Sequence, residues 1–243
     1  MSQLHGSAEW TVFLVDGFDM LTAKPKNVVW TVAAAHESSH GLGDRFDAVT
    51  PTGLTKLTLV QTGAFWDTTP GGIHDTFKTP SVAARTVMLG PAGNTAGAPM
   101  LVINGVVAAS YEVVATVGQL TKGNVTYQVN GPASSGALAA PLAHYTGTID
   151  TSATPSDGGI ESPNGATLTV QATVFDAGTT TATIIVRHSL TGTSGWTDLH
   201  SFVVTGAPSV QTFAVAGVVH RYIALGGVTD GGVTVAVSVQ RNP

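Results

Sequence analysis

Residues 27–67 read NVVWTVAAAHESSHGLGDRFDAVTPTGLTKLTLVQTGAFWD, and this stretch decides between two incompatible folds. In one interpretation it contains a helix with His36-Glu37-Ser38-Ser39-His40, the H-E-x-x-H pattern of zinc proteases. In the other, strands at Asn27–Ala35 and Leu54–Ala64 flank a polar loop at Ser38–Gly53. The first interpretation indicates a hydrolase, and the second indicates a structural protein.

The zinc interpretation depends on helical spacing. His36 and His40 would lie one helical turn apart and could ligate the same zinc ion, with Glu37 polarising a bound water. The longer metzincin form of the pattern adds a third histidine six residues after His40, but the chain has Phe46 there. The pattern is therefore incomplete in this chain.

The residues around the motif favour extended structure. The run Val28-Val29-Trp30-Thr31-Val32 is β-branched or aromatic, which disfavours helix and favours strand. Ser38 and Ser39 would lie inside the helix, where serine side chains compete for backbone hydrogen bonds. We therefore predict strand, loop and strand, with no cofactor and no metal. His36, Glu37 and His40 are the metal-ligand candidates of the alternative.

Alternation of apolar and polar residues dominates the second half of the chain. In Thr167–Val174 one face carries three threonines and a glutamine, opposite Leu168, Val170, Ala172 and Val174. Val233–Val239 repeats the pattern with four valines on one face. Successive side chains of a strand point to opposite faces, so these segments are predicted to be half-buried strands.

The whole chain fits an all-β protein, a barrel or sandwich of mostly antiparallel strands with long loops. Short turn-forming runs such as Asp176-Ala177-Gly178 and Asp230-Gly231-Gly232 separate the predicted strands. One short helix is expected near Gly72–Lys78, with Thr69 as its cap and Pro70 at its first position. Further strands are predicted at Trp10–Val15, Tyr111–Val117, Asn124–Val129, Thr181–His188, Ser201–Val204, Gln211–Val215 and Arg221–Leu225.

Three segments read as flexible loops, at Gly90–Pro99, Gly131–Pro141 and Thr151–Gly165. None of them is a convincing linker, so a single domain of residues 1–243 is predicted. Its first part, to about residue 80, contains the polar loop. Its second part, from about residue 81, is expected to be an elaborated outer β-sandwich portion.

Composition points to self-assembly. Charged residues make up 10% of the 243 residues and hydrophobic residues 43%, whereas about a quarter of a typical soluble domain is charged. A chain that buries part of its surface against copies of itself tolerates so few charges. No apolar run is long enough for a membrane-spanning helix, and the start of the chain does not resemble a signal peptide. The chain has no cysteine.

Other functional classes lack their signatures. The net charge is −5 and the basic residues are scattered, so tight binding to nucleic acid is not expected. The remaining histidines show no metal-ligand spacing, and no G-x-S-x-G elbow or P-loop occurs. We therefore expect no enzymatic activity. A Ser-His-Asp triad would have to be assembled from distant residues.

The stretch 27–67 and its flanks resemble the tail tube (major tail) proteins of long-tailed bacteriophages, particularly those of actinobacterial hosts. The resemblance rests on moderately specific motifs, which with the C-terminal region cover about two-thirds of the chain. The C-terminal region from Arg187 through Trp196 to Arg221-Tyr222 looks like the β-sandwich parts of phage virion proteins. The motifs are Val15-Asp16-Gly17-Phe18-Asp19, Gly41-Leu42-Gly43-Asp44, Pro51-Thr52-Gly53-Leu54-Thr55-Lys56-Leu57-Thr58-Leu59 and Gly63-Ala64-Phe65-Trp66-Asp67.

The resemblance implies a virion protein of the tail, made in the host cytoplasm, whose subunits form hexameric rings. The rings stack into a tube around a tape-measure protein and conduct DNA when the genome is ejected. Tail terminator and distal tail proteins are further implied partners. A long loop between two early strands contacts the neighbouring ring in this family. Ser38–Gly53 is the equivalent by position, with Asp44, Arg45, Phe46 and Asp47 as its contact residues.

Two alternatives stay open. The same β pattern fits a capsid decoration or baseplate binding module, in which Trp196, after the turn Gly192–Gly195, could stack on a sugar. The other alternative is a zinc hydrolase that uses His36, Glu37 and His40. Both differ from a tail tube subunit in where the protein is found or in what it binds.

Overall fold

The computed structural model describes residues 10–38, 49–79 and 83–243. The chain packs as two compact units. Unit one contains residues 10–22, 85–103 and 133–243, and unit two contains the described parts of 23–84 and 104–132. The chain thus leaves unit one after residue 22 and returns to it twice. The prediction of one domain over residues 1–243 stays a prediction.

The predicted all-β class is confirmed. Across the described residues the only α-helix is α1 (Ile73–Phe77), and the strands pair antiparallel, as in β1–β5, β10–β14 and β3–β4. No helix in the described ranges is long and apolar enough to span a membrane. Unit one holds β1 (Val12–Val15), β2 (Phe18–Asp19), β5 (Arg85–Gly90), β8 (Ala133–Asp150), β9 (Ser156–Asp157), β10 (Ala166–Phe175), β11 (Thr181–Ser189), β12 (Thr197–Thr205), β13 (Ser209–Val215) and β14 (Tyr222–Arg241). Unit two holds β3 (Asn27–Ser38), β4 (Val49–Phe65), α1 and β7 (Lys122–Val129), while β6 (Pro99–Val114) passes from unit one into unit two after Ile103.

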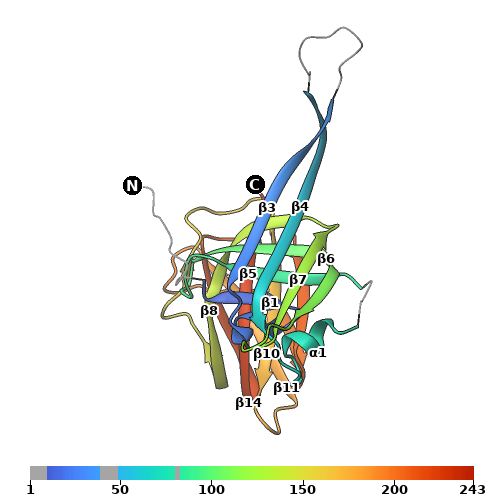
Figure 1. The fold of residues 1–243 in the computed structure, drawn as a ribbon. Helices are drawn as coiled ribbons and strands as arrows, with labels where there is room; N and C mark the ends of the chain where they lie inside the picture. Colours follow the sequence, from blue (N-terminus) through green and yellow to red (C-terminus); the bar gives the residue numbers. More distant parts are fainter. Residues whose placement is uncertain (1–9, 39–48, 80–82) are drawn as a thin grey trace. The chain divides into compact units, whose positions relative to one another are not determined.

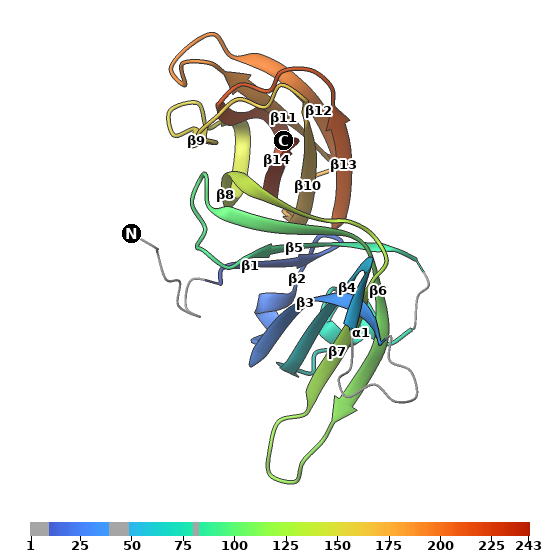
Figure 2. The ribbon, with the colours of Figure 1, turned by 90° about the horizontal axis from the view of Figure 1, so that it is seen from above.

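Unit one is organised around β14, a strand of 20 residues. Its first half pairs with β11, its second half pairs with β10, and β8 runs along its other edge. Strands β10 to β14 curve around a common interior (Figure 2). The buried side chains of that interior include Leu168, Val170, Ile184, Val186, Phe202, Val204, Val235 and Val237.

The sheet of unit one is not a closed barrel. Strands β12 and β13 lie at the two ends of the run β12-β11-β14-β10-β13. Side chains bridge them: the Gln211 amide donates to the Val203 carbonyl at 2.7 Å, and His200 stacks on Phe213 with ring centroids 3.6 Å apart. The open arrangement fits the sandwich form of the predicted class.

The strands of unit one are more completely buried than their alternation predicts. The apolar positions Leu168 and Val170 are fully buried, as predicted, but Thr169 and Gln171 on the opposite face are also at 0% exposure. The Gln171 side chain accepts the Gly17 backbone N–H at 2.8 Å and donates to the Thr86 carbonyl at 3.2 Å. Buried polar groups need such partners. β10 is therefore covered on both faces, and the prediction of a half-buried strand is wrong there.

Two predictions, one of a loop and one of a turn, are wrong because the structure has strand at both places. Gly131–Pro141 is not a flexible loop, because β8 begins at Ala133 and pairs with β6 from Pro99 to Ile103. The turn expected at Asp230-Gly231-Gly232 does not end the strand. β14 continues through these residues, and its pairing with β8 shifts register there. Small residues allow close strand approach as well as loops, so composition alone misassigned these segments.

Unit two is a four-stranded sheet with the order β3-β4-β7-β6. β4 pairs with β7 from Thr58 to Phe65, and β7 pairs with β6 from Val106 to Val114. One face packs under α1 and buries Leu59, Ala64, Ile73, Phe77, Val125 and Tyr127. The predicted short helix is confirmed, but it begins at Ile73 after Gly72, not after Thr69.

The two strands predicted in residues 27–67 are confirmed and are longer than expected. β3 and β4 pair from Asn27↔Thr62 to Ser38↔Val49. The predicted loop at Ser38–Gly53 is therefore partly wrong, because its ends are strand. Figure 1 shows the β3–β4 hairpin continuing well beyond β6 and β7 of the same unit.

Candidate assembly surface

The predicted site residues fall in and around the β3–β4 hairpin. His36 and Glu37 lie in β3, where their backbone pairs with Pro51 and Thr50 of β4. His40, and the contact candidates Asp44, Arg45, Phe46 and Asp47, lie outside the described residues. The backbone at His36 and Glu37 is extended, so the helical turn that the zinc interpretation needs does not form there. Among the described residues no group of three or more His, Asp or Glu side chains is placed to hold a metal.

We expect Glu37→Ala to leave the purified protein unchanged in fold, assembly and metal content. The reason is that an extended His36-Glu37 segment does not provide the geometry of a zinc-bound water. Elemental analysis of wild type and variant checks this, with zinc added before gel filtration. Stoichiometric zinc in the wild type that is lost in the variant would instead support the hydrolase.

β3 is the exposed edge of unit two. In the part of the chain that the structure describes, β3 pairs only with β4. Val29 and Val32 are 51% and 57% exposed along it. Residues 27–33 of this edge contain no charged residue. Natural proteins protect edge strands with lysines, prolines or a covering element, because a bare edge pairs with other chains. β3 therefore has the character of a strand that a partner covers.

The hairpin formed by β3 and β4 extends beyond the rest of the sheet. β7 pairs with β4 only from Thr58 onward, whereas the β3–β4 ladder continues to Ser38↔Val49. Residues 33–38 and 49–56 thus form a two-stranded ribbon by themselves. An isolated two-stranded hairpin is marginally stable in water and needs packing against something else. Among the described strands, none adds a third strand to this ribbon.

The opposite end of the unit-two sheet is held by an aromatic cluster. The Trp66 ring lies 5.0 Å from that of His74 on α1, and the His74 Nδ1 lies 3.2 Å from the Tyr111 hydroxyl. Phe77 packs edge-on against Tyr127, whose hydroxyl donates to the buried Gln61 at 3.0 Å. Burial raises the pKa of Tyr111 above its ordinary value. The cluster fixes α1 against β4, β6 and β7.

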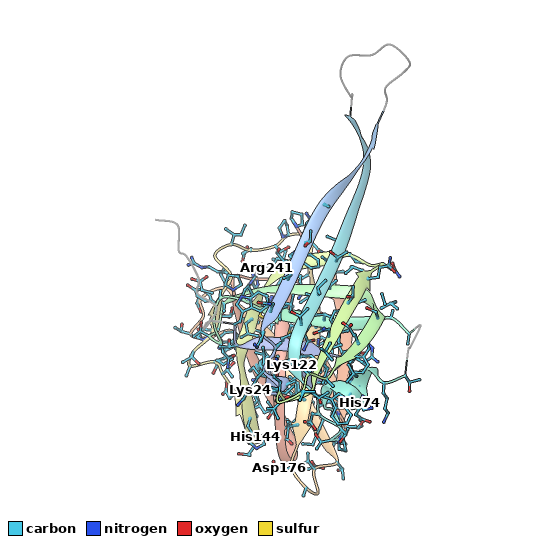
Figure 3. The ribbon with its side chains drawn as sticks, viewed as in Figure 1. Lys24, His74, Lys122, His144, Asp176 and Arg241 are labelled. Atoms are coloured by element: carbon cyan, nitrogen blue, oxygen red, sulfur yellow. The ribbon has the colours of Figure 1, made fainter. Side chains whose placement is uncertain are left out.

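A hydroxyl, an imidazole and a carboxylate form a row in unit one. The His144 Nδ1 lies 3.2 Å from the Thr234 hydroxyl, and its Nε2 lies 3.3 Å from an Asp176 carboxylate oxygen (Figure 3). The order of groups is that of a hydrolytic triad. However, the side chains of His144 and Asp176 are 42% and 52% exposed, so water competes for every interaction in the row. We interpret it as a surface bridge between β8, β14 and the end of β10.

A buried histidine makes unit one sensitive to acid. His188 stacks on His220 with ring centroids 4.5 Å apart, and the His188 Nδ1 accepts the backbone N–H of His220 at 3.0 Å. Burial lowers the pKa of His188, and the nearby positive charges of His220 and Arg241 lower it further, against a smaller opposing effect of Glu161. Glu161 itself pairs with the His220 ring at 2.6 Å.

The lowered pKa of His188 predicts loss of stability in acid. Between the folded pKa and about 6.5, the usual unfolded value, the unfolded chain binds more protons at this site. The contribution of His188 is therefore complete above that value and is lost as pH falls through the folded pKa. Urea unfolding at pH 7.5 and pH 5 measures the effect. His188→Asn, which keeps an acceptor for His220, should reduce the difference, and an unchanged difference would assign it to other groups.

Comparison with known proteins gives a structural likeness but no sequence match. No family model matches the chain, and no curated protein matches its sequence. Among solved structures the chain is similar to the crystal structure of the Dit protein of phage SPP1, described as a paradigm of the hub adsorption apparatus in phages that infect Gram-positive bacteria. The likeness covers 96% of this chain and 100% of that one at 12% identity, with a TM-score of 0.36. At this TM-score nothing about the function of the chain follows from it.

Sequence reasoning missed the exposed apolar residues at the far end of unit two. Val113, Val114 and Val117 fall at the end of a predicted strand, Tyr111–Val117, which stops at Val114 in the structure. The signal was present in the run Val113-Val114-Ala115-Thr116-Val117, which is apolar on both faces of a strand. Neighbouring valines in such a run cannot all face one core.

Proposed function

We propose that the chain is a structural protein of a long-tailed bacteriophage, the tail tube subunit, and not an enzyme. The observation that carries the proposal is the sheet of unit two, which combines an edge strand that is uncharged over residues 27–33 with a hairpin that extends beyond the sheet. Both features need a partner surface. A subunit that repeats itself in a ring and in a stack of rings supplies two such surfaces.

The edge strand supports lateral association. Extended strands add to an exposed sheet edge through main-chain hydrogen bonds, and alternate side chains give specificity. β3 offers its outer backbone groups together with the exposed Val29. An edge that joins a different surface of the next copy produces a ring when the rotation closes. Closed rings also remove the free edges that would otherwise aggregate.

The composition of the unit-two sheet supports a role as a conduit. Its described strand segments 27–33, 58–65, 106–114 and 122–129 contain only two charged residues, Glu112 and Lys122. The register of β4 and β7 places neutral polar side chains, such as Thr58, Thr126 and Gln128, on the face turned away from α1. Binding to phosphates requires lysine and arginine, so this face would let DNA pass without holding it.

We propose further that the rings enclose a tape-measure protein and meet terminator and distal tail proteins at the two ends of the tube. In this arrangement the β3–β4 hairpin, with Asp44, Arg45, Phe46 and Asp47 in its connecting loop, contacts the neighbouring ring. The length of the hairpin supports this, because the ribbon extends beyond the described residues of β7 that pair with β4.

Immunogold labelling of virions tests the assignment. A tail tube subunit should be labelled along the full tail once the particle is partly opened, at many regularly spaced positions. The control is an antibody to a capsid protein of the same particle, which should label the head only. Gold confined to the head or to the tail tip would contradict the tail tube assignment.

A second candidate is a capsid decoration or baseplate binding module. Unit one favours it, because this β-sandwich is complete without the edge strand and presents the half-buried Trp196 beside a turn. That turn packs on the protein itself, since the space next to Gly192 is filled by the Tyr222 ring. Glycan binding that is abolished by Trp196→Ala, with gold at the head or tail tip, would favour this candidate over the tube.

A further inference from the structure

Exposed apolar residues gather at the end of the unit-two sheet that lies opposite the projecting hairpin. Scattered exposed hydrophobic residues are normal on a protein surface, but clusters mark interaction sites. We name this set the end patch, and Val117 at 103% and Leu120 at 70% are its most exposed members. The other members are Phe65 at 37%, Trp66 at 40%, Val113 at 46% and Val114 at 37%.

Strand register brings these residues together from three strands. Lys122 of β7 is paired with both Phe65 of β4 and Val114 of β6. The Trp66 backbone N–H donates to the Thr121 carbonyl at 3.0 Å, which fixes β4 to the loop that joins β6 and β7. Val117 and Leu120 lie in that loop. Phe65 and Val114 lie on the face of Lys122, whereas Val113 and Trp66 lie on the α1 face, so the end patch wraps around the end of the sheet.

Part of the end patch is held in place by packing against α1 and β6. Trp66 contacts His74 on α1, and His74 contacts Tyr111 on β6. This packing holds the most bulky member of the patch in place before any partner arrives. A preformed surface loses less conformational entropy on binding.

The size of the end patch fits a protein interface. A fully exposed aromatic side chain presents about 150–250 Å² and valine or leucine less, so the six exposed fractions amount to roughly a few hundred Å² of apolar surface. That is comparable to the largest apolar patch of a typical monomer. A standard interface buries about 800 Å² on each partner, so the patch supplies most of the apolar centre of one interface.

The charges around the end patch disfavour a lipid surface. Membrane-binding surfaces combine apolar residues with several lysines or arginines. The strand segments that carry this patch contain one lysine, Lys122, and Glu112 on the neighbouring strand balances it. The Glu112 carboxylate accepts the Asn124 amide at 3.0 Å, so it is held in place on that face. A neutral apolar surface of this size fits a protein partner of equally low charge.

We propose that the end patch docks a second copy of this chain through the β3–β4 hairpin. The two features lie at opposite ends of the same sheet, because β4 runs from the hairpin connection at Val49 to the patch at Phe65. Joining one end to the other end of the next copy is a heterologous contact that repeats without limit. The exposed Val32, near the base of the ribbon, is the described residue that meets Val117 and Leu120 of the next copy.

This inference rests on the proposed function and names the surface that receives the hairpin. Its first test is the double variant Val117→Asp with Leu120→Asp, because both side chains are exposed and the fold does not depend on them. We expect the protein concentration needed for stacking to rise by at least about tenfold, measured by sedimentation and electron microscopy. The matched control is Ile160→Asp with Leu190→Asp, two positions of unit one that are 75% and 62% exposed.

The outcomes separate the two proposals. Unchanged stacking of the double variant, with a wild type that stacks, would overturn the end patch and leave the tail tube assignment standing. A wild type that never assembles overturns both. Equal loss in the control pair would also overturn the end patch, because the effect would then reflect added charge alone. Thermal unfolding of each variant confirms that it is folded.

Cysteine cross-linking tests the contact itself. The chain has no native cysteine, so single cysteines can be placed without side reactions. Protein carrying Val32→Cys is mixed with protein carrying Leu120→Cys under assembly conditions and treated with a short thiol-reactive cross-linker. We expect dimers of the two different variants. Mixing Val32→Cys with Leu190→Cys should give at most about a tenth of that yield, and equal yields would contradict the proposal.

Discussion

Replacing residues 33–56 by Asn-Gly is expected to give a folded protein that no longer stacks into tubes. Val32 of β3 and Leu57 of β4 lie directly opposite each other. Asn-Gly forms the tight two-residue turn that joins such a pair. The change removes the ribbon and leaves the ladder between β4 and β7, which begins at Thr58. Gel filtration and sedimentation should find no assembly larger than a single ring, and the melting temperature should be within a few degrees of the wild type.

A shorter deletion separates the roles of the ribbon and its connection. Replacing residues 39–48 by Asn-Gly joins Ser38 to Val49, which are also paired. This variant lacks Asp44, Arg45, Phe46 and Asp47 but retains both strands. We expect it to form rings that stack less well than the wild type. Full assembly of the longer deletion would show that the hairpin has no part in assembly.

The second large effect is expected at Gly227, where β14 is paired with β11 on one side and β8 on the other. Gly227 has a φ of 137°, and a β-carbon there would overlap the Thr183 carbonyl oxygen of β11. Gly227→Ala combines a backbone conformation that side chains avoid with a clash against a paired strand. We expect a loss of about 3 kcal/mol or more in the free energy of unfolding, equivalent to roughly 6–12 °C in melting temperature.

Gly178→Ala is the matched control for this prediction. Gly178 also has a positive φ, 90°, but the space around its missing β-carbon is empty. Only the backbone preference is lost there, at a cost of about 1 kcal/mol. Calorimetry of both variants compares them directly. Equal losses would mean that the close approach of β11 to β14 does not matter for stability.

The sequence predicted the fold class because alternation is a local signal. Thr181–His188 and Thr167–Val174 each bury one set of alternate residues against the interior, and both strands were placed within a residue or two of their ends. Burial of the opposite face of β10 could not be foreseen. It depends on Gln171 reaching Gly17 and Thr86, which are distant in sequence.

Strands with small residues were the hardest to predict. β8 begins in Ala133-Ser134-Ser135-Gly136, and Gly136 leaves no room for a side chain against Val239 of β14. These residues are small because two backbones approach closely, which the sequence alone presents as a flexible loop. Likewise, Asp230-Gly231-Gly232 allows β14 to shift register and continue, although the same residues form turns elsewhere.

The strands of the candidate assembly surface were predicted, whereas the contact role of Asp44, Arg45, Phe46 and Asp47 stays a prediction. The stretch 27–67 correctly indicated two strands, because the β-branched residues around Trp30 favour extended structure. The edge position of β3 depends on which strands pair, and pairing is a long-range property. The end patch depends on β4, β6 and β7 ending together, which follows from register and not from any one of the three segments.

The most direct measurement of the central claim is negative-stain electron microscopy of the purified wild-type protein across a range of concentrations. The account predicts rings that stack into tubes of constant width, with length increasing with concentration. A protein that stays a 24.7 kDa monomer at the highest concentration, without rings or tubes, would contradict it.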